Sequence, residues 1–187
     1  MSTAAPSPPL PPRAYAAGYG LLGAVGLLLA LNASWLARNC EDLRALGPGQ
    51  VAPDFDLLTL TGDRVKLSDL RGRVVLIEFW SLGCPACVQS MPELRRVAGK
   101  LKDRPFTLLA VHLRSRPGHR RALAAFADEE SLQFPILLDP GIAGETYKVR
   151  LMPTTVLVDP QGKIRKVWRG VVSERTLRGA IERLLPR

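Results

Sequence analysis

The sequence predicts an α/β domain in which helices cover both faces of a mixed sheet, preceded by one membrane-spanning helix. Two observations support this prediction. Apolar runs rich in β-branched residues alternate with segments of helical composition through residues 51–187, an order typical of strands connected by helices. A separate uncharged stretch occupies residues 14–37. The 187 residues are therefore expected to form one domain with an N-terminal appendage.

The N-terminal appendage is expected to anchor the chain in a membrane. As a helix, the uncharged residues 14–37 would span about 36 Å, which is enough for the hydrocarbon core of a bilayer. Cleavage as a signal peptide is disfavoured because the large residues Leu31 and Trp35 occupy position −3 of the two candidate sites. We expect a Pro-rich tail at 1–13, a transmembrane anchor at 14–37 and a linker at 38–50.

The elements of the domain at 51–187 follow from local composition. Strands are expected at the apolar runs, which are residues 65–67, 74–79, 106–113, 134–138, 155–158 and 164–168. Helices are expected at 86–101, 118–130, 142–149 and 173–185. Pro160-Gln161-Gly162-Lys163 is a hairpin turn between the last two strands, and Ser173 is the predicted N-cap of the last helix.

Composition and charge restrict the class of protein. Hydrophobic residues make up 47% and charged residues 23% of the chain, which excludes a disordered chain and a multi-pass membrane protein. The net charge of +9 favours an acidic partner or a membrane surface, and no nucleic acid is expected as a partner. One basic cluster is interpreted as a solvated helix face, with an acidic partner or anionic lipid headgroups as the alternative: Arg114, Arg116, His119, Arg120 and Arg121.

A Cys-Pro-Ala-Cys motif, Cys84 to Cys87, lies between a predicted buried strand and a predicted helix. Cys84 would begin the helix, where free amide groups and the helix dipole stabilise a thiolate. Pro85 fits the first helical turn, where its missing N–H is not needed. Cys84 is therefore predicted to be the attacking thiol, and Cys87 the thiol that resolves a mixed disulfide.

The same cysteine pair could form half of a zinc site. A complete site would need two more ligands. The remaining candidates, Cys40, His112 and His119, form no second paired motif. No metal is therefore expected, and Cys40 is interpreted as a spare thiol near the membrane.

Further motifs accompany the cysteine pair, namely residues 51–55, 67–72, 74–80, Pro92 and 147–155. With them the domain resembles the TlpA/ResA-like branch of membrane-anchored, thioredoxin-fold thiol–disulfide oxidoreductases, which are related to the redoxin and AhpC/TSA proteins. The resemblance covers essentially all of 51–187. It implies a three-layer thioredoxin-like fold with an N-terminal extension and a helix–strand insertion at about 114–147.

The resemblance also implies an activity and a location. The expected reaction is exchange of the dithiol or disulfide with protein substrates, in the reducing direction, as in cytochrome c maturation or copper-site assembly. An upstream transmembrane thiol reductant would supply electrons, and no bound cofactor is expected. The catalytic domain would lie on the periplasmic side of the cytoplasmic membrane, where thiol–disulfide exchange is useful for cell redox homeostasis.

Residues of the substrate-binding surface are implied by the same resemblance. Met152–Pro153 matches the family's cis-proline, with Thr154 next to it, and the Met152 backbone would pair with an extended substrate segment. Trp80 is expected in the wall of the active site, and Pro85 between the cysteines would also contact substrate.

Two positions depart from the family pattern. Gly83 stands where Trp commonly precedes the first cysteine, and Ser90 stands where many members carry a glutamate that serves the resolving thiol. An acid occurs instead at Glu78, inside an apolar strand and matching the buried aspartate of thioredoxin. We interpret Glu78 as an acid of raised pKa that accepts the Cys87 proton. The alternative is a salt bridge at a strand edge.

Two other functions remain as alternatives, a thiol peroxidase and a copper chaperone. A thiol peroxidase would need Pro-x-x-x-Thr/Ser-x-x-Cys, but here Ile77 replaces the proline although Ser81 fits. A copper chaperone usually has a wider Cys-x-x-x-Cys motif and a late histidine, and the sequence has neither.

Overall fold

The computed structural model describes residues 26–33 and 46–186. The chain divides into two compact units, Met1–Arg44 and Ala45–Arg187. Residues 26–33 form a helix in the first unit. No helix among the described residues is long and apolar enough to cross a bilayer. The expected tail at 1–13 and much of the expected anchor and linker lie outside the described residues.

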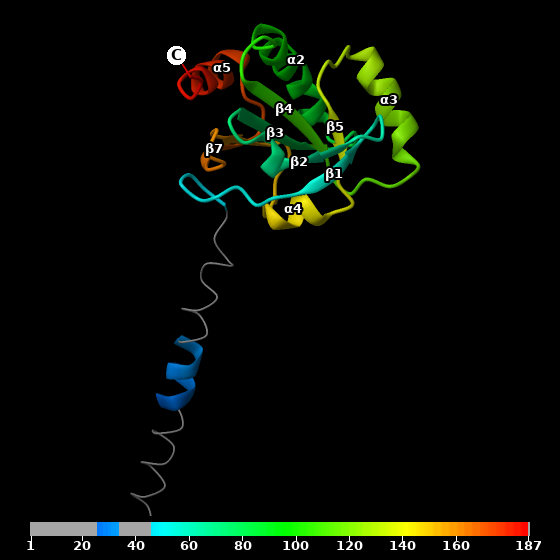
Figure 1. Cartoon of the computed structure of the whole chain (residues 1–187). Helices are drawn as coiled ribbons and strands as arrows, with labels where there is room; N and C mark the ends of the chain where they lie inside the picture. The colour runs from blue at the N-terminus through cyan, green and yellow to red at the C-terminus, as the bar shows by residue number, and fades with distance from the viewer. Residues whose placement is uncertain (1–25, 34–45, 187) are drawn as a thin grey trace, which may run out of the picture. The chain divides into compact units, whose positions relative to one another are not determined.

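A mixed sheet lies at the centre of the second unit, as predicted, but it has seven strands where six were predicted (Figure 1). Its strand order is β2-β1-β5-β4-β3-β6-β7. The central strands β3, β4 and β5 run parallel, and the flanking pairs are antiparallel. The strands are β1 (Asp56–Thr59), β2 (Arg64–Lys66), β3 (Val74–Trp80), β4 (Phe106–His112), β5 (Ile136–Leu138), β6 (Thr154–Val158) and β7 (Ile164–Arg169).

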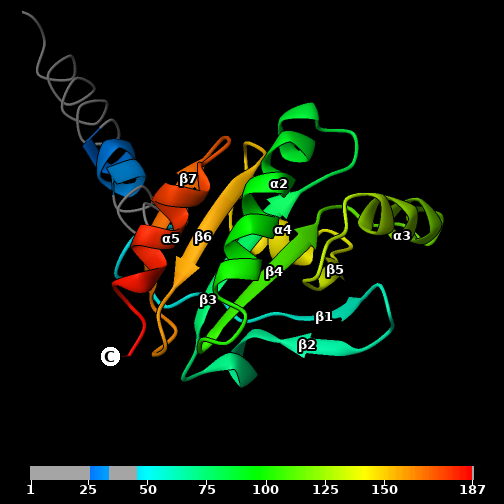
Figure 2. The same cartoon turned by 90° about the horizontal axis from the view of Figure 1, so that it is seen from above.

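Helices cover both faces of the sheet, which gives three layers (Figure 2). The core on one face contains residues of α2, α3 and α5, and the core on the other contains residues of α4. The helices are α2 (Pro85–Lys100), α3 (His119–Glu129), α4 (Ile142–Thr146) and α5 (Glu174–Glu182), with a 3-10 helix η1 (Leu67–Leu70) after β2. This arrangement is a thioredoxin-like α/β fold.

Alternate side chains of β3 enter these two cores. Leu76 and Trp80 pack in the core that contains α2, whereas Ile77 and Phe79 pack in the core that contains α4. Successive side chains of a strand point to opposite faces. Glu78 therefore lies on the same face as Leu76 and Trp80, beneath α2.

The structure differs from the predicted elements in several places; the helix predicted at 173–185, for example, ends at Glu182. Strand β1 was not predicted, because it has four residues and only two of them are buried. The helix predicted at 142–149 ends at Thr146. Lys148 has φ +52°, the left-handed region in which a helix cannot continue. Ser173 does cap α5, since its Oγ accepts a hydrogen bond from the backbone N–H of Thr176 at 3.4 Å.

Candidate active site

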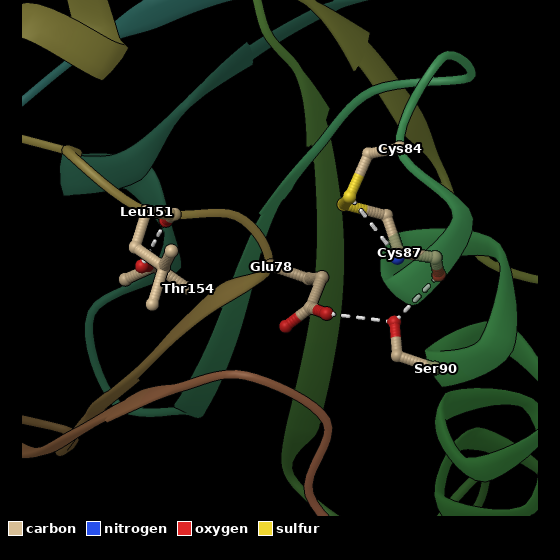
Figure 3. The surroundings of a disulfide bond; sticks show 6 residues. All are labelled: Glu78, Cys84, Cys87, Ser90, Leu151 and Thr154. Carbon is tan, nitrogen blue, oxygen red and sulfur yellow. Dashed lines mark hydrogen bonds between the residues drawn. A yellow bond between two sulfur atoms is a disulfide. The ribbon is translucent and has the colours of Figure 1, made fainter.

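The cysteine pair lies at the beginning of α2, directly after the loop that follows β3 (Figure 3). Cys84 is the N-cap residue, with extended backbone angles, and Pro85 occupies the first helical turn. Cys84 Sγ accepts a hydrogen bond from the backbone N–H of Cys87 at 3.2 Å. The same N–H also donates a 3.0 Å hydrogen bond to the Cys84 carbonyl, so the start of the helix directs an amide dipole at the sulfur that can stabilise negative charge there.

Cys84 and Cys87 are joined in a disulfide, with their Cα atoms 5.2 Å apart. The two cysteines differ in accessibility. Cys84 is half-buried, whereas Cys87 is 0% exposed and packs in the core with α2. A substrate sulfur can therefore approach Cys84 but not Cys87, the asymmetry that the sequence interpretation requires.

The loop before β6 lies at the same end of the sheet as the cysteine pair. Thr154, the first residue of β6, is the cross-strand partner of Phe79 near the end of β3. The preceding Met152–Pro153 bond is cis, the conformation that the resemblance implies. Met152 is 37% exposed, and the Thr154 hydroxyl donates a 2.6 Å hydrogen bond to the Leu151 carbonyl (Figure 3). The loop therefore presents an exposed residue, Met152, at the sheet end that carries the redox centre.

Glu78 is a buried acid, with 1% of its surface exposed. Its strand β3 lies between β4 and β6, so Glu78 is not at an edge of the sheet. Among the described residues, Glu78 forms no ion pair. Burial raises the pKa of Glu78 from 4.5 to about 7, although hydrogen bonds from Thr155 and Ser90 lower it in part. The carboxyl group can therefore exchange a proton near neutral pH.

Ser90 connects Glu78 to the helix that carries Cys87 (Figure 3). Ser90 Oγ lies 2.9 Å from Glu78 Oε1 and 2.8 Å from the Cys87 carbonyl oxygen. A hydroxyl has one hydrogen and can donate to only one of these acceptors at a time. Ser90 therefore donates either to Glu78, which favours the charged carboxylate, or to the Cys87 carbonyl. The residue that replaces the family's helix glutamate thus contacts the acid on β3.

Sequence reasoning did not identify Thr155 as the second partner of Glu78. Thr155 Oγ1 donates a 2.6 Å hydrogen bond to Glu78 Oε2 from the neighbouring strand β6. Such a contact depends on the register of two strands that are far apart in the chain. Only a prediction of which strands are adjacent, and in which register, could have found it.

Trp80, expected in the active-site wall, is fully buried and offers no exposed surface to a substrate. Its ring packs against His112 and Phe126, each with a centroid separation of 5.4 Å. Among the described residues, the Trp80 indole N–H has no hydrogen-bond partner. Pro85, by contrast, is exposed at the start of α2. In this oxidised state Trp80 is a core residue beneath the redox centre.

Comparison with known proteins agrees with the fold and with a thiol–disulfide oxidoreductase. A profile of the AhpC/TSA family matches residues 48–167. The thioredoxin-like protein YneN of Bacillus subtilis is 31% identical over 159 residues, which cover 84% of this chain and 93% of YneN. The thiol-disulfide oxidoreductase ResA of Halalkalibacterium halodurans is 30% identical over 159 residues, which cover 84% of this chain and 89% of ResA.

Solved structures show the same architecture. A crystal structure from Chlorobium tepidum, described as a thiol:disulfide interchange protein DsbE, superposes with a TM-score of 0.64. It is 34% identical in sequence, and the match covers 74% of this chain and 95% of that chain. A solution structure from Bacteroides thetaiotaomicron, described as a protein disulfide isomerase, has a TM-score of 0.65 at 31% identity, and the match covers 76% of this chain and 94% of that chain.

Proposed function

Because the chain belongs to the AhpC/TSA family and is a thioredoxin-fold thiol–disulfide oxidoreductase, we propose that it reduces disulfides of protein substrates through Cys84 and Cys87. The observation that carries the proposal is the asymmetry of the pair. One sulfur is accessible at a helix N-terminus, and the other is buried three residues later. That arrangement supports attack by the first thiol and resolution by the second.

The exchange proceeds in two steps. In the reduced protein, the Cys84 thiolate attacks one sulfur of a substrate disulfide, and the other substrate sulfur leaves as a thiolate that takes up a proton. Cys87 then loses its proton and attacks Cys84 Sγ, which breaks the mixed disulfide. The second substrate sulfur leaves as a thiolate and takes up a proton from solvent. Two electrons have moved to the substrate, and Cys84 and Cys87 form the disulfide present in the structure.

Glu78 is the proposed acceptor of the Cys87 proton. The carboxyl group lies on the face of β3 beneath α2, with a pKa of about 7 and a hydrogen bond through Ser90 to the backbone of Cys87. A general base is most useful when its pKa is close to the working pH. On reduction of the disulfide by an electron donor, the same group would return the proton.

Substrate is proposed to bind at the loop of Met152, Pro153 and Thr154, with Pro85 on the facing side. The exposed Met152 supports this assignment, since it is next to the cis bond and at the sheet end that carries Cys84. An extended substrate segment would pair there with the backbone of residue 152. Trp80 would support this surface from below rather than contact substrate.

The cellular setting is proposed from the sequence. Residues 14–37 would anchor the chain in the cytoplasmic membrane, between the tail at 1–13 and the linker at 38–50, and residues 51–187 would act on the periplasmic side. An upstream transmembrane dithiol would reduce the Cys84–Cys87 disulfide after each turnover. The protein substrates would be those of cytochrome c maturation or copper-site assembly, with no bound cofactor and no nucleic acid.

The thiol peroxidase alternative is less well supported. Ser81 lies three residues before Cys84, as a peroxidase would require. However, Ile77 replaces the proline of that motif, is fully buried, and packs in the core that contains α4. It lies on the opposite face of β3 from Glu78 and cannot shape a peroxide pocket around Cys84.

Trapping of a mixed disulfide tests the proposal. A Cys87→Ser variant should retain attack by Cys84 and accumulate a covalent adduct with a disulfide-containing protein, whereas Cys84→Ser should form none. Mildly acidic alkylation of the reduced protein should label Cys84 before Cys87. Preferential labelling of Cys87, or adducts with Cys84→Ser, would contradict the assignment. Equilibration against glutathione buffers would then measure the potential of the pair.

A further inference from the structure

A pocket of about 630 Å³ opens beside the redox centre, between loops at the carboxyl ends of β3, β4 and β5. Ser81, from the loop before Cys84, and Met152, from the loop before β6, both contribute to its lining. In open α/β sheets, the crevice at the carboxyl ends of the strands is the usual place for a ligand. The pocket therefore adjoins the surface on which substrate is proposed to bind.

Three arginines line this pocket: Arg114 and Arg116 from the loop after β4, and Arg150 from the segment after α4. All three side chains are exposed. Among the described residues, none of the three guanidinium groups takes part in a salt bridge. Only part of the basic cluster described in the sequence analysis lines this pocket, since Arg121 does not contribute to the lining. Arg150 lines the pocket as well, although it comes from a distant segment of the chain.

The two acidic residues of the lining do not neutralise these arginines. Asp139 is fully buried, and its carboxylate accepts hydrogen bonds of 2.9–3.1 Å from the backbone N–H groups of Gly141, Ala143 and Gly144. Its charge is therefore stabilised by the start of α4. Glu145 supplies the exposed carboxylate of the lining. In the part of the chain that the structure describes, the exposed side chains of the lining thus include three arginines without a salt bridge but only one carboxylate, that of Glu145.

The arginine loop is tied to the redox loop. The backbone N–H of Leu113 donates a 2.9 Å hydrogen bond to the carbonyl of Trp80, and the N–H of Ser115 donates a 2.6 Å bond to the carbonyl of Asp139. Arg114 between them has φ +52°, a left-handed conformation that is unfavourable for a residue with a side chain. The basic loop is therefore held at a defined place beside the cysteines.

We propose that this pocket binds acidic side chains of the protein substrate that lie close to its disulfide, and so makes Arg114, Arg116 and Arg150 specificity-determining residues. The inference rests on the proposed function, since it concerns the substrates of the same redox centre. Aspartate or glutamate carboxylates suit exposed guanidinium groups, which can bind them with two parallel hydrogen bonds. Their attraction would also accelerate encounter of substrate with Cys84.

The test compares two disulfide-bonded peptides that differ only at two flanking positions, glutamate in one and glutamine in the other. The reduced full-length protein should reduce the glutamate peptide about tenfold faster at low ionic strength, since steering by charge raises association rates by about ten- to a thousandfold. Added salt should diminish the preference by screening. The double variant Arg114→Gln/Arg150→Gln should reduce both peptides at nearly equal rates.

Two controls separate this inference from the proposed function. Arg175→Gln removes an exposed arginine of α5, outside the pocket lining, and should keep the full preference. The uncharged 2-hydroxyethyl disulfide should be reduced at the same rate by every variant. Equal rates for the two peptides in the parent protein, or an equal loss of preference in Arg175→Gln, would overturn the proposed pocket specificity. Failure of the parent protein to reduce any of the disulfides would contradict the proposed function as well.

Discussion

Glu78 and Thr155 are cross-strand partners on β3 and β6, and the Thr155 hydroxyl donates a 2.6 Å hydrogen bond to Glu78 Oε2. The other carboxyl oxygen is 2.9 Å from the hydroxyl of Ser90 on α2. Both hydrogen bonds favour the charged form of Glu78, but burial favours the neutral form more strongly, and the resulting pKa is about 7. The hydroxyl groups of Thr155 and Ser90 thus limit the rise in the pKa of Glu78 that burial causes.

Replacing Glu78 with glutamine should slow resolution of the mixed disulfide. The fold should be retained because the shape is similar, but the general base is lost, and such groups typically contribute about 10²–10⁴-fold to a rate. Stopped-flow reduction of a disulfide substrate from pH 5 to 9 should show a slower rate and a loss of the inflection near pH 7. An unchanged rate and pH profile would mean that Glu78 has only a structural role.

Replacing Thr155 with valine should move the same inflection to higher pH. Valine keeps the shape of the side chain but removes the hydrogen bond that lowers the pKa of Glu78. The pH–rate profiles of the parent and variant proteins provide the measurement. Thr154→Val is a matched control, because the Thr154 hydroxyl donates to the Leu151 carbonyl and not to Glu78. A shift in the control alone would contradict this account.

Stability should depend on pH through two buried groups that act in opposite directions. Between about pH 4.5 and 7, folded Glu78 holds a proton that the unfolded chain has released, so its contribution to stability falls as pH rises, by about 3 kcal/mol in total. Burial and the nearby His119 lower the pKa of His112 from 6.5 to about 4. Between these values only the unfolded chain binds the proton, so this contribution rises with pH.

Urea unfolding of the oxidised protein from pH 4.5 to 7 measures both contributions. Glu78→Gln should gain stability relative to the parent protein as pH rises, because the falling contribution is removed. His112→Asn should lose stability relative to the parent protein as pH rises to 6.5, because the rising contribution is removed. Parallel pH profiles for the parent and Glu78→Gln would show that the folded-state pKa of Glu78 is close to that of the unfolded chain.

Replacing either of two glycines with alanine should change the stability of the domain, but in opposite directions. Gly162, in the turn between β6 and β7, has φ +80°, and an added Cβ would also meet the Arg71 guanidinium group. Gly162→Ala should therefore destabilise the domain by about 1–2 kcal/mol, the energy of a left-handed residue with a side chain. Gly99 is an exposed residue of α2 with open space at its Cβ, so Gly99→Ala should stabilise by about 0.5–1 kcal/mol. Thermal unfolding of both variants would show whether the signs are correct.

Full-length protein should remain in the membrane fraction through high-salt and alkaline washes, because burial of an apolar helix is not an electrostatic attachment. A truncated protein that begins at Leu46 should be soluble and keep disulfide-reductase activity. It should also be more stable than one that begins at Val51, because Gly49 and Gln50 exchange backbone hydrogen bonds with Ile164, each 2.8 Å long. Mature protein that lacks residues 1–33 would show that the signal is cleaved.

The sequence by itself determined the α/β class, the order of most elements and the position of the cysteine pair. These are local properties: the apolar run at 74–79 matches a strand buried on both faces, and Cys84-Pro85 has the composition of a helix start. The buried acid at Glu78 was also visible, because a charged residue within an apolar strand requires a reason. Strand β1 was missed, since half of its four residues are exposed.

The tertiary structure alone decided what surrounds these residues. Thr155 is 77 residues from Glu78 in the chain, and their contact depends on β6 pairing with β3 in one register. The meeting of Arg114 with Arg150 at one pocket depends in the same way on loops that gather at one end of the sheet. Local composition cannot encode such contacts, because strand order and register arise from packing of the whole core. The pKa of Glu78 and the charge beside Cys84 are therefore properties of the folded domain.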